Sequence, residues 1–143
     1  MSGWNVSEAL TVAIINDCLK QNGFTEDRVN MYYESVKIDG EIVDDRIWNL
    51  QKSCSKSRSG LPGRIEFIIR PNERDDLLII IEAKEKIVDH QNNGPNGELT
   101  DINERPVTDI KRYAIDGALH YAKHFSAGFN VIAIAVSGSN SDM

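Results

Sequence analysis

The acidic and basic residues best suited to chemistry lie in two apolar segments, residues 64–70 and 77–84. Glu82 and Lys84 close the second segment. Alternate residues of a strand point to the same side, about 6.6 Å apart at a rise of roughly 3.3 Å per residue. If the two segments pair as an antiparallel hairpin with its turn midway between them, Glu66 lies opposite Glu82 on the same face.

Two carboxylates that face each other repel, and when partly buried they must be neutralised or bind a cation. Lys84 supplies one positive charge, and a divalent metal would supply the rest. Mg²⁺ prefers oxygen ligands and keeps several waters, so one or two carboxylates beside a substrate phosphate suffice. We expect Glu66 and Glu82 to bind Mg²⁺ through their side chains and Ala83 through its backbone carbonyl, with Mn²⁺ able to substitute.

This set of groups suits metal-dependent hydrolysis of a phosphodiester. The metal would polarise the phosphoryl oxygen and help to generate a hydroxide for in-line attack. Lys84, as a compact charge, would orient that hydroxide or stabilise the developing negative charge. The sequence therefore predicts Glu66, Glu82 and Lys84 as catalytic residues.

The segments around these residues have the composition of a sheet. Both are rich in Ile, Leu and Phe and are bounded by Pro, Gly, Asn and Asp, which predicts a β-hairpin. Residues 77–81 are apolar on both faces, as in a central strand. Residues 130–136 predict a last buried strand, parallel to a neighbour because a helix precedes it. Residues 30–36 fit either a short helix or an edge strand.

The first helix is predicted over residues 5–20. Asn5 and Glu8 have capping-box spacing, and Gly23 is the expected stop. Glu8 also heads a stripe of inward positions at helical spacing, completed by Val12, Ile15 and Leu19. It is therefore either a capping acid at the positive end of the helix dipole or a further metal ligand.

Two more helices are predicted over residues 44–52 and 108–125. The first has acids in its first turn and a base near its end. In the second, His120 and His124 lie four residues apart on one face. A zinc pair would need a third ligand that is not evident, so we expect partly exposed surface histidines.

The composition is that of one soluble globular domain. The chain has 143 residues, 41% of them hydrophobic and 27% charged, which allows one core and is too short for two ordinary domains. No secretory leader is evident, the longest apolar run is too short to span a membrane, and the two cysteines have neither zinc nor disulfide spacing. We expect a cytoplasmic protein without membrane contact and with reduced cysteines.

The net charge of −6 argues against a free-standing, tight nucleic-acid binder. Residues 51–64 nevertheless carry no acid and four bases, Lys52, Lys56, Arg58 and Arg64. Their loop is either a solvated connection or a clamp on a phosphate backbone. Residues 90–106 predict a second, polar loop, long enough to be functional or disordered.

An acid on one strand followed by Glu-x-Lys on the next, here Glu66 and the triplet that ends at Lys84, resembles the PD-(D/E)xK nuclease superfamily. The resemblance extends to the order helix, hairpin, helix, strand. It implies an α/β fold, a restriction-endonuclease-like central mixed β-sheet flanked by helices, over residues 1–137, with residues 138–143 as a flexible tail or linker. It also implies Mg²⁺-dependent cleavage of DNA. Glu66 stands where the superfamily usually has Asp, which is one methylene shorter.

A narrower resemblance concerns residues 109–113. Their spacing is similar to the Gln-x-x-x-Tyr helix motif of RecB-like nucleases and type I restriction subunits, with Asp in place of Gln. It implies phosphate contacts from the two bases of the segment and a position for its tyrosine near Lys84. The alternative is an ordinary amphipathic helix with a solvated basic edge. The DNA-binding candidates are Lys56, Arg58, Arg64, Lys111, Arg112 and Tyr113.

The acidic charge and the lack of a base-reading module imply that recognition of double-stranded DNA lies elsewhere. The resemblance suggests the N-terminal nuclease domain of a larger restriction enzyme, with methyltransferase, translocase or recognition domains in the same polypeptide. Cleavage of both strands would need two active sites, as in a homodimer. The alternatives are a non-catalytic binding or scaffold domain with the same fold and a RecB-like nuclease for junctions or RNA.

Overall fold

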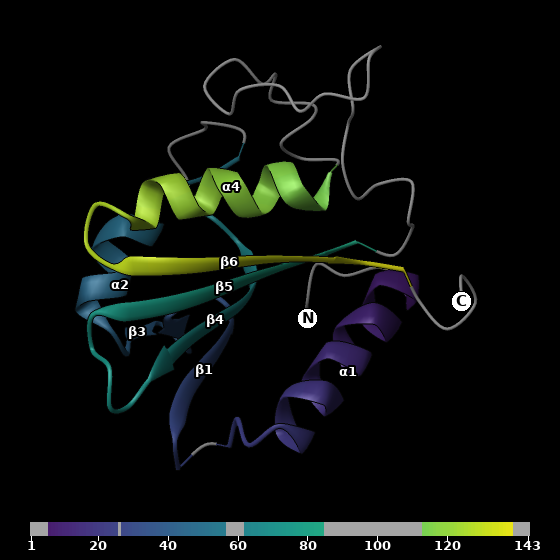
Figure 1. The fold of residues 1–143 in the computed structure, drawn as a ribbon. Coiled ribbons are helices and arrows are strands. Elements are labelled where there is room, and N and C mark those ends of the chain that lie inside the picture. Colours follow the sequence, from purple (N-terminus) through teal and green to yellow (C-terminus); the bar gives the residue numbers. More distant parts are fainter. Residues whose placement is uncertain (1–5, 26, 57–61, 85–112, 139–143) are drawn as a thin grey trace.

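The computed structural model describes residues 6–25, 27–56, 62–84 and 113–138 (Figure 1). In these parts the chain is mixed α/β. The helices are α1 (Val6–Gln21), α2 (Asp45–Gln51) and α4 (Ala114–Phe125). The strands are β1 (Val29–Glu34), β2 (Lys37–Ile38), β3 (Glu41–Ile42), β4 (Ile65–Pro71), β5 (Leu77–Lys84) and β6 (Asn130–Ser137).

The main sheet has four described strands in the order β1-β4-β5-β6. β4 is antiparallel to both β1 and β5, whereas β5 and β6 are parallel. The predicted hairpin, the mixed sheet and the parallel last strand are therefore confirmed. β2 and β3 form a separate two-stranded hairpin, and its turn residues Asp39 and Gly40 both have positive φ, as a tight two-residue hairpin turn requires.

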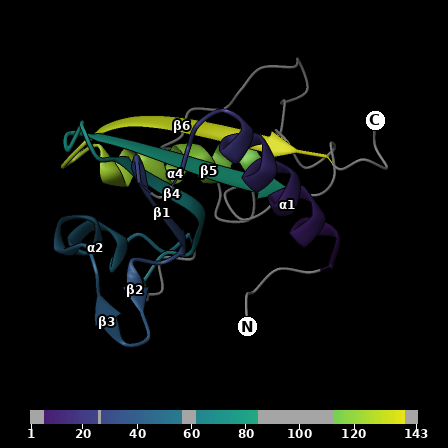
Figure 2. The same cartoon turned by 90° about the horizontal axis from the view of Figure 1, so that it is seen from below.

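Helices cover both faces of this sheet: Figure 1 shows α4 on one side and α1 on the other, and Figure 2 shows the same layers from below. Successive side chains of β5 point to opposite faces of the sheet, so β5 contributes to the core under each helix. Leu78 and Ile80 belong to the core that includes Tyr121 and Phe125 of α4. Ile79 and Ile81, which alternate with them, face α1 and pack against Val12 and its neighbours. β5 is thus the buried central strand that its apolar sequence predicts.

The first helix matches its predicted limits closely. Val12 and Ile15 are buried and Leu19 packs beside them, which confirms the inward stripe. Gly23 has φ of +88°, and the amides of Gly23 and Phe24 donate to the carbonyls of Lys20 and Leu19 at 3.2 and 3.0 Å. These two bonds are a Schellman motif, which ends the helix where glycine permits the left-handed conformation.

The segments 30–36 and 44–52 form an edge strand and a capped helix. The segment 30–36, which fitted a helix or an edge strand, contributes to edge strand β1. The predicted helix 44–52 is confirmed as α2: Asp44 caps it by accepting a hydrogen bond from the amide of Ile47 at 3.0 Å.

Two predictions about the last helix and strand are wrong. Tyr113 has the extended backbone of an N-cap, so α4 begins at Ala114 and Tyr113 lies outside it; residues 108–112 lie outside the described residues, as does the predicted loop 90–106. β6 is not buried, because it is an edge strand of the described sheet, with Ile132 and Ile134 exposed by 47% and 38%. An apolar run shows that both faces are apolar but not that both are covered.

Gln51 fixes the approach to β4 through a fully buried amide. Its Oε1 accepts a hydrogen bond from the amide of Val36 at 3.1 Å. Its Nε2 donates to the carbonyls of Glu34 and Gly63, both at 2.8 Å. The end of β1, the end of α2 and the start of β4 are therefore joined at one side chain.

Gln51→Met should destabilise the protein strongly. The substitution keeps the side-chain length but leaves three buried backbone groups without partners, each worth roughly 1–3 kcal/mol, so we expect a loss of about 3 kcal/mol or more in the free energy of unfolding. Urea denaturation followed by circular dichroism measures it. Asn49→Ala, at an exposed position of the same helix, is the control, and equal stability of the two variants would contradict the role of Gln51.

Candidate active site

The two predicted acids lie next to each other on the two central strands. β4 and β5 pair with Phe67 opposite Ile81, and the next step of this register puts Glu66 opposite Glu82. Glu66 is 8% exposed and Glu82 is fully buried. The hairpin register expected from the sequence is therefore confirmed, and it brings two carboxylates together inside the domain.

The cation that contacts Glu82 comes from the basic loop. Lys56 Nζ lies 2.5 Å from Glu82 Oε2, and the Lys56 side chain is only 15% exposed. The same ammonium lies 5.3 Å from the centre of the Tyr121 ring, within the range of a cation–π contact. Oε1 of Glu82 is also buried but accepts no hydrogen bond from any described residue. One oxygen of Glu82 is thus neutralised and the other is left available.

A glycine in α4 makes room for this ion pair. A Cβ at Gly117 would lie 2.8 Å from Glu82 Oε2 and 3.0 Å from Lys56 Nζ. Any larger residue would therefore press on both charged groups. The close approach also places the Glu82 carboxylate beside the first turn of α4, where the positive end of the helix dipole favours an anion.

Lys84 lies at the end of β5 on the same side of the strand as Glu82, and it is partly buried. Its backbone carbonyl accepts a hydrogen bond from the amide of Gly138 at 3.0 Å. The carbonyl of Gly138 in turn accepts from the hydroxyl of Thr11 at 2.7 Å. These bonds tie α1 to the strand ends that carry the candidate site. They also hold Gly138, the first residue of the predicted tail; residues 139–143 lie outside the described residues.

Buried neutral groups surround the ion pair. The Tyr121 hydroxyl donates to the carbonyl of Arg64 at 2.9 Å, and burial raises the pKa of Tyr121. Burial likewise raises the pKa of the Cys54 thiol to about 12 and lowers the pKa of His120. All three therefore stay uncharged near neutral pH, in a setting where charge interactions are stronger than in water.

The histidine pair is different from what the sequence predicts. His120 is only 5% exposed, and its Nε2 lies 2.9 Å from the carbonyl oxygen of Cys54. The expected exposed position is therefore wrong for His120. Its ring is held by a backbone carbonyl, and its centre lies 4.6 Å from that of the His124 ring. His120 thus joins α4 to the loop before β4, whereas His124 contacts His120 within the helix.

The donor set fits a small, hard cation better than a transition metal. Within the described ranges no three His, Cys, Asp or Glu side chains gather as a metal site. The available Oε1 of Glu82, the buried Glu66 and the backbone at Ala83 are oxygen donors on neighbouring positions. Magnesium can be held by one or two carboxylates with water and phosphate as the remaining ligands, so these residues are compatible with it. Glu8 lies in α1, but its side chain is outside the described structure.

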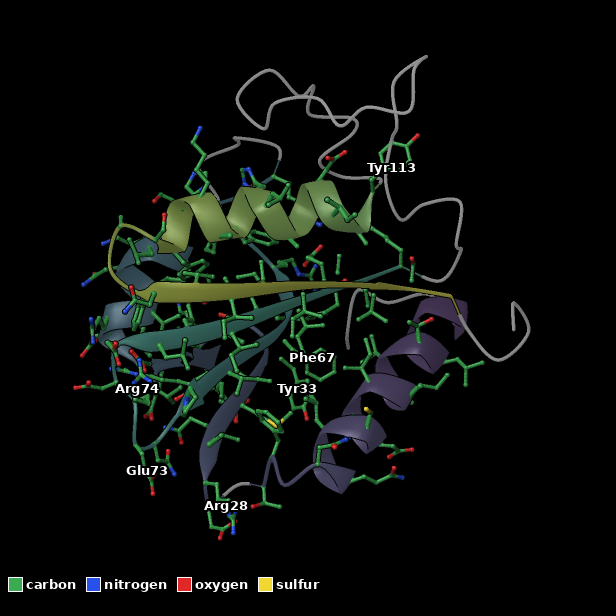
Figure 3. All side chains as sticks on the ribbon, in the orientation of Figure 1. Arg28, Tyr33, Phe67, Glu73, Arg74 and Tyr113 are labelled. Carbon is green, nitrogen blue, oxygen red and sulfur yellow. The ribbon has the colours of Figure 1, made fainter. Side chains whose placement is uncertain are left out.

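The predicted DNA-binding residues fall into separate places. Arg64 is exposed beside β4 and its Nη2 lies 3.2 Å from Glu34 Oε2. Tyr113 precedes α4, at the end of the molecule opposite Glu73 and Arg74 of the β4–β5 turn (Figure 3). Lys56 lies inside the site. The candidates outside the described residues are Arg58, Lys111 and Arg112.

Sequence reasoning missed three residues of the site. It placed Lys56 in a loop that was either a solvated connection or a clamp on a phosphate backbone, and it gave Gly117 and Tyr121 no role in the site. Their roles depend on how α4 and the loop before β4 meet over β5, which no short pattern records. The only available signal was that the basic stretch lies just before Glu66.

Comparisons with protein-family models, curated proteins and solved structures find no match to this chain. Among the described helices, none combines the length and the hydropathy needed to cross a lipid bilayer.

Gly117→Ala should destabilise the protein although alanine is the better helix former. Propensity alone would stabilise α4 by about 1 kcal/mol, but crowding of a packed site typically costs about 1–3 kcal/mol. We expect a net loss of about 1 kcal/mol, measured by urea denaturation. Ala122→Gly, in the same helix, is the control and should lose about 1 kcal/mol through propensity. A Gly117→Ala variant more stable than the wild type would refute the close approach.

Proposed function

We propose that this chain is a metal-dependent endonuclease domain that hydrolyses DNA phosphodiester bonds, with a restriction-endonuclease-like fold. One observation carries the proposal: the register of β4 and β5 gives Glu66 and Glu82 opposed positions on one face, and the buried Oε1 of Glu82 accepts no hydrogen bond from the described residues. A buried carboxylate oxygen is costly unless it is hydrogen-bonded or binds a cation. A role as a metal ligand in catalysis would explain why this oxygen of Glu82 is buried without a hydrogen bond from the described residues.

The order of elements supports the fold assignment. Among the described elements, the helix α1, the antiparallel strands β1, β4 and β5, the covering helix α4 and the parallel last strand β6 come in this order, with the β2–β3 hairpin and α2 inserted between β1 and β4. The Glu-x-Lys triplet lies on β5, the acid that precedes it lies on the paired strand β4, and α4, the next described helix, packs on β5 and β6. The motif therefore has the strand context that its resemblance requires.

Each group of the site has a role in the proposed reaction. Glu66, Glu82 and the Ala83 carbonyl would hold Mg²⁺ or Mn²⁺, with Glu8 as a further candidate. Bound metal supplies a Lewis acid at the phosphate and an activated water. Lys84, at the end of β5, would orient the attacking water or stabilise negative charge on the phosphate.

Lys56 is a positioning residue in this scheme. Its ammonium holds Oε2 of Glu82 at 2.5 Å, which leaves Oε1 for the metal. It also offsets one of the two carboxylate charges, so that the pair can remain buried without the metal. Because the Lys56 side chain is largely buried, holding Glu82 is a more suitable role for it than contact with a DNA backbone.

Double-stranded DNA would approach the end of the sheet at which β5 and β6 terminate. Arg64 and Tyr113 lie among the described candidates for backbone contact, and Arg58, Lys111 and Arg112 complete the set. With a net charge of −6, the domain would need further affinity from recognition, methyltransferase or translocase domains of the same polypeptide. A RecB-like nuclease for junctions is a variant of this proposal.

A non-catalytic binding or scaffold domain is the second candidate. The observation that favours it is again the Lys56–Glu82 contact. A carboxylate that already has a cation can be purely structural. Glu66 in place of Asp also departs from the superfamily pattern.

Metal binding and cleavage should separate the roles of the site residues. We expect Mn²⁺, titrated by calorimetry, to bind the wild type and to bind Glu82→Gln and Glu66→Gln at least about 10-fold more weakly, because each loses an anionic ligand. Lys84→Met should keep Mn²⁺ binding and lose cleavage of duplex DNA by about 100-fold or more, as expected for a group that acts on the transition state.

Exposed residues of the same types provide the controls. Glu73→Gln in the β4–β5 turn and Lys20→Met at the end of α1 are both exposed and should behave as the wild type. Mn²⁺ binding without cleavage of DNA or RNA would favour the non-catalytic domain. Identical Mn²⁺ affinity in the wild type, Glu82→Gln and Glu66→Gln would remove the proposed metal site.

A further inference from the structure

The outer edge of β6 lacks the features that normally keep edge strands apart. β6 is the last strand of the sheet, and its outer side pairs with no described strand. Its eight residues include no charge, proline or glycine. Edge strands usually carry charges, prolines or bulges that prevent pairing with another chain. From Val131 to Val136 the outer backbone of β6 is therefore unpaired by any described strand and can take a further one.

Apolar side chains flank this edge on both faces of the sheet. On the α1 face, Ile132 and Ile134 are 47% and 38% exposed. On the α4 face there is an open apolar groove of about 270 Å³, lined by Ile115, Ala118, Leu119, Ala133 and Ala135. An added strand would pair with the backbone of β6 and cover both apolar surfaces at once.

We propose that the occupant is a second copy of the chain, whose β6 pairs antiparallel with this one about a two-fold axis at Ala133. The axis runs perpendicular to the sheet, so the α4 faces of both copies lie on the same side. Ile132 then lies opposite Ile134 of the second copy, and the reverse pair forms by symmetry. The two four-stranded sheets become one continuous sheet.

The charge distribution favours a second copy at this edge. Two molecules of net charge −6 repel each other, and association needs a surface where like charges are not opposed. β6 is uncharged along its whole length. A register centred at Ala133 also pairs Ile132 of each copy with Ile134 of the other. Moving the centre of the register to Ile132 would instead pair Ile134 of one copy with the polar Asn130 of the other.

The position of α4 favours the same arrangement. α4 contacts both β5 and β6 and runs along β6 in Figure 1, so it lies above the space between these strands. With strands about 4.8 Å apart, the two-fold axis places the two copies of α4 about 10 Å from each other. Packed helices are separated by 8–10 Å. Leu119, which is 36% exposed, belongs to the groove between them.

The dimer would place two candidate sites on one face of the joined sheet. Glu82 pairs with Ala135 in the ladder between β5 and β6, so each site lies one strand from the interface. Three strand spacings across and four residues along put the two Glu82 positions roughly 20 Å apart. Only this consequence rests on the proposed nuclease function; it would supply one site for each strand of a duplex.

Sedimentation equilibrium of the full chain, from low micromolar to submillimolar concentration, tests the proposal. The wild type should be a dimer. Ile132→Lys/Ile134→Lys opposes like charges across the interface and should raise the dissociation constant at least about 100-fold. Ile132→Lys/Ile134→Glu puts Lys opposite Glu in both copies, so it should remain a dimer. Ile38→Lys, at a 46% exposed isoleucine of β2, is the matched control and should remain a dimer too.

Circular dichroism establishes that each variant is folded before its association is compared. A wild type that stays monomeric at submillimolar concentration would overturn the proposal. Equal behaviour of the two double variants would also overturn it, because only the antiparallel register distinguishes them. Open-ended growth with concentration would show pairing that does not close about a two-fold axis, and so would exclude this dimer.

Discussion

The burial of Glu82 is the constraint on which the rest of the site depends. A carboxylate taken out of water loses several kcal/mol of hydration unless nearby groups replace it. Lys56 replaces part of it at 2.5 Å, the first turn of α4 adds the field of its backbone amides, and Gly117 leaves the space that both need. The loop before β4, the helix and the strand must therefore be placed together, and Gln51 anchors that loop at its start.

The backbone around the site was largely predictable. Two apolar runs bounded by turn residues predicted the β4–β5 hairpin, and a turn midway between them predicted the register in which Glu66 is opposite Glu82. Acids in the first turn of the segment 44–52 predicted where α2 begins, and Gly23 predicted where α1 ends. These are local signals: each depends on the hydrogen-bonding or steric preference of a residue within its own segment.

The contacts across the site were not predictable for the same reason. Lys56 reaches Glu82 from a loop 26 residues earlier in the chain, and the need for glycine at 117 appears only once α4 is docked. The exposure of β6 also depends on tertiary structure, since the described sheet ends there. A sequence pattern shows which faces of a strand are apolar. Whether those faces are buried depends on whether another helix or strand packs against them.

The sequence separation of the strands has a consequence for the order of folding. The β4–β5 turn spans residues 72–76, whereas β5 and β6 pair across residues 85–129. Closing the longer loop costs more chain entropy, so the hairpin can form first. Glu66 and Glu82 would then meet while still hydrated and lose water only when α4 docks. A late dehydration step means that changes around Glu82 alter the unfolding rate more than the folding rate, a difference that stopped-flow kinetics can resolve.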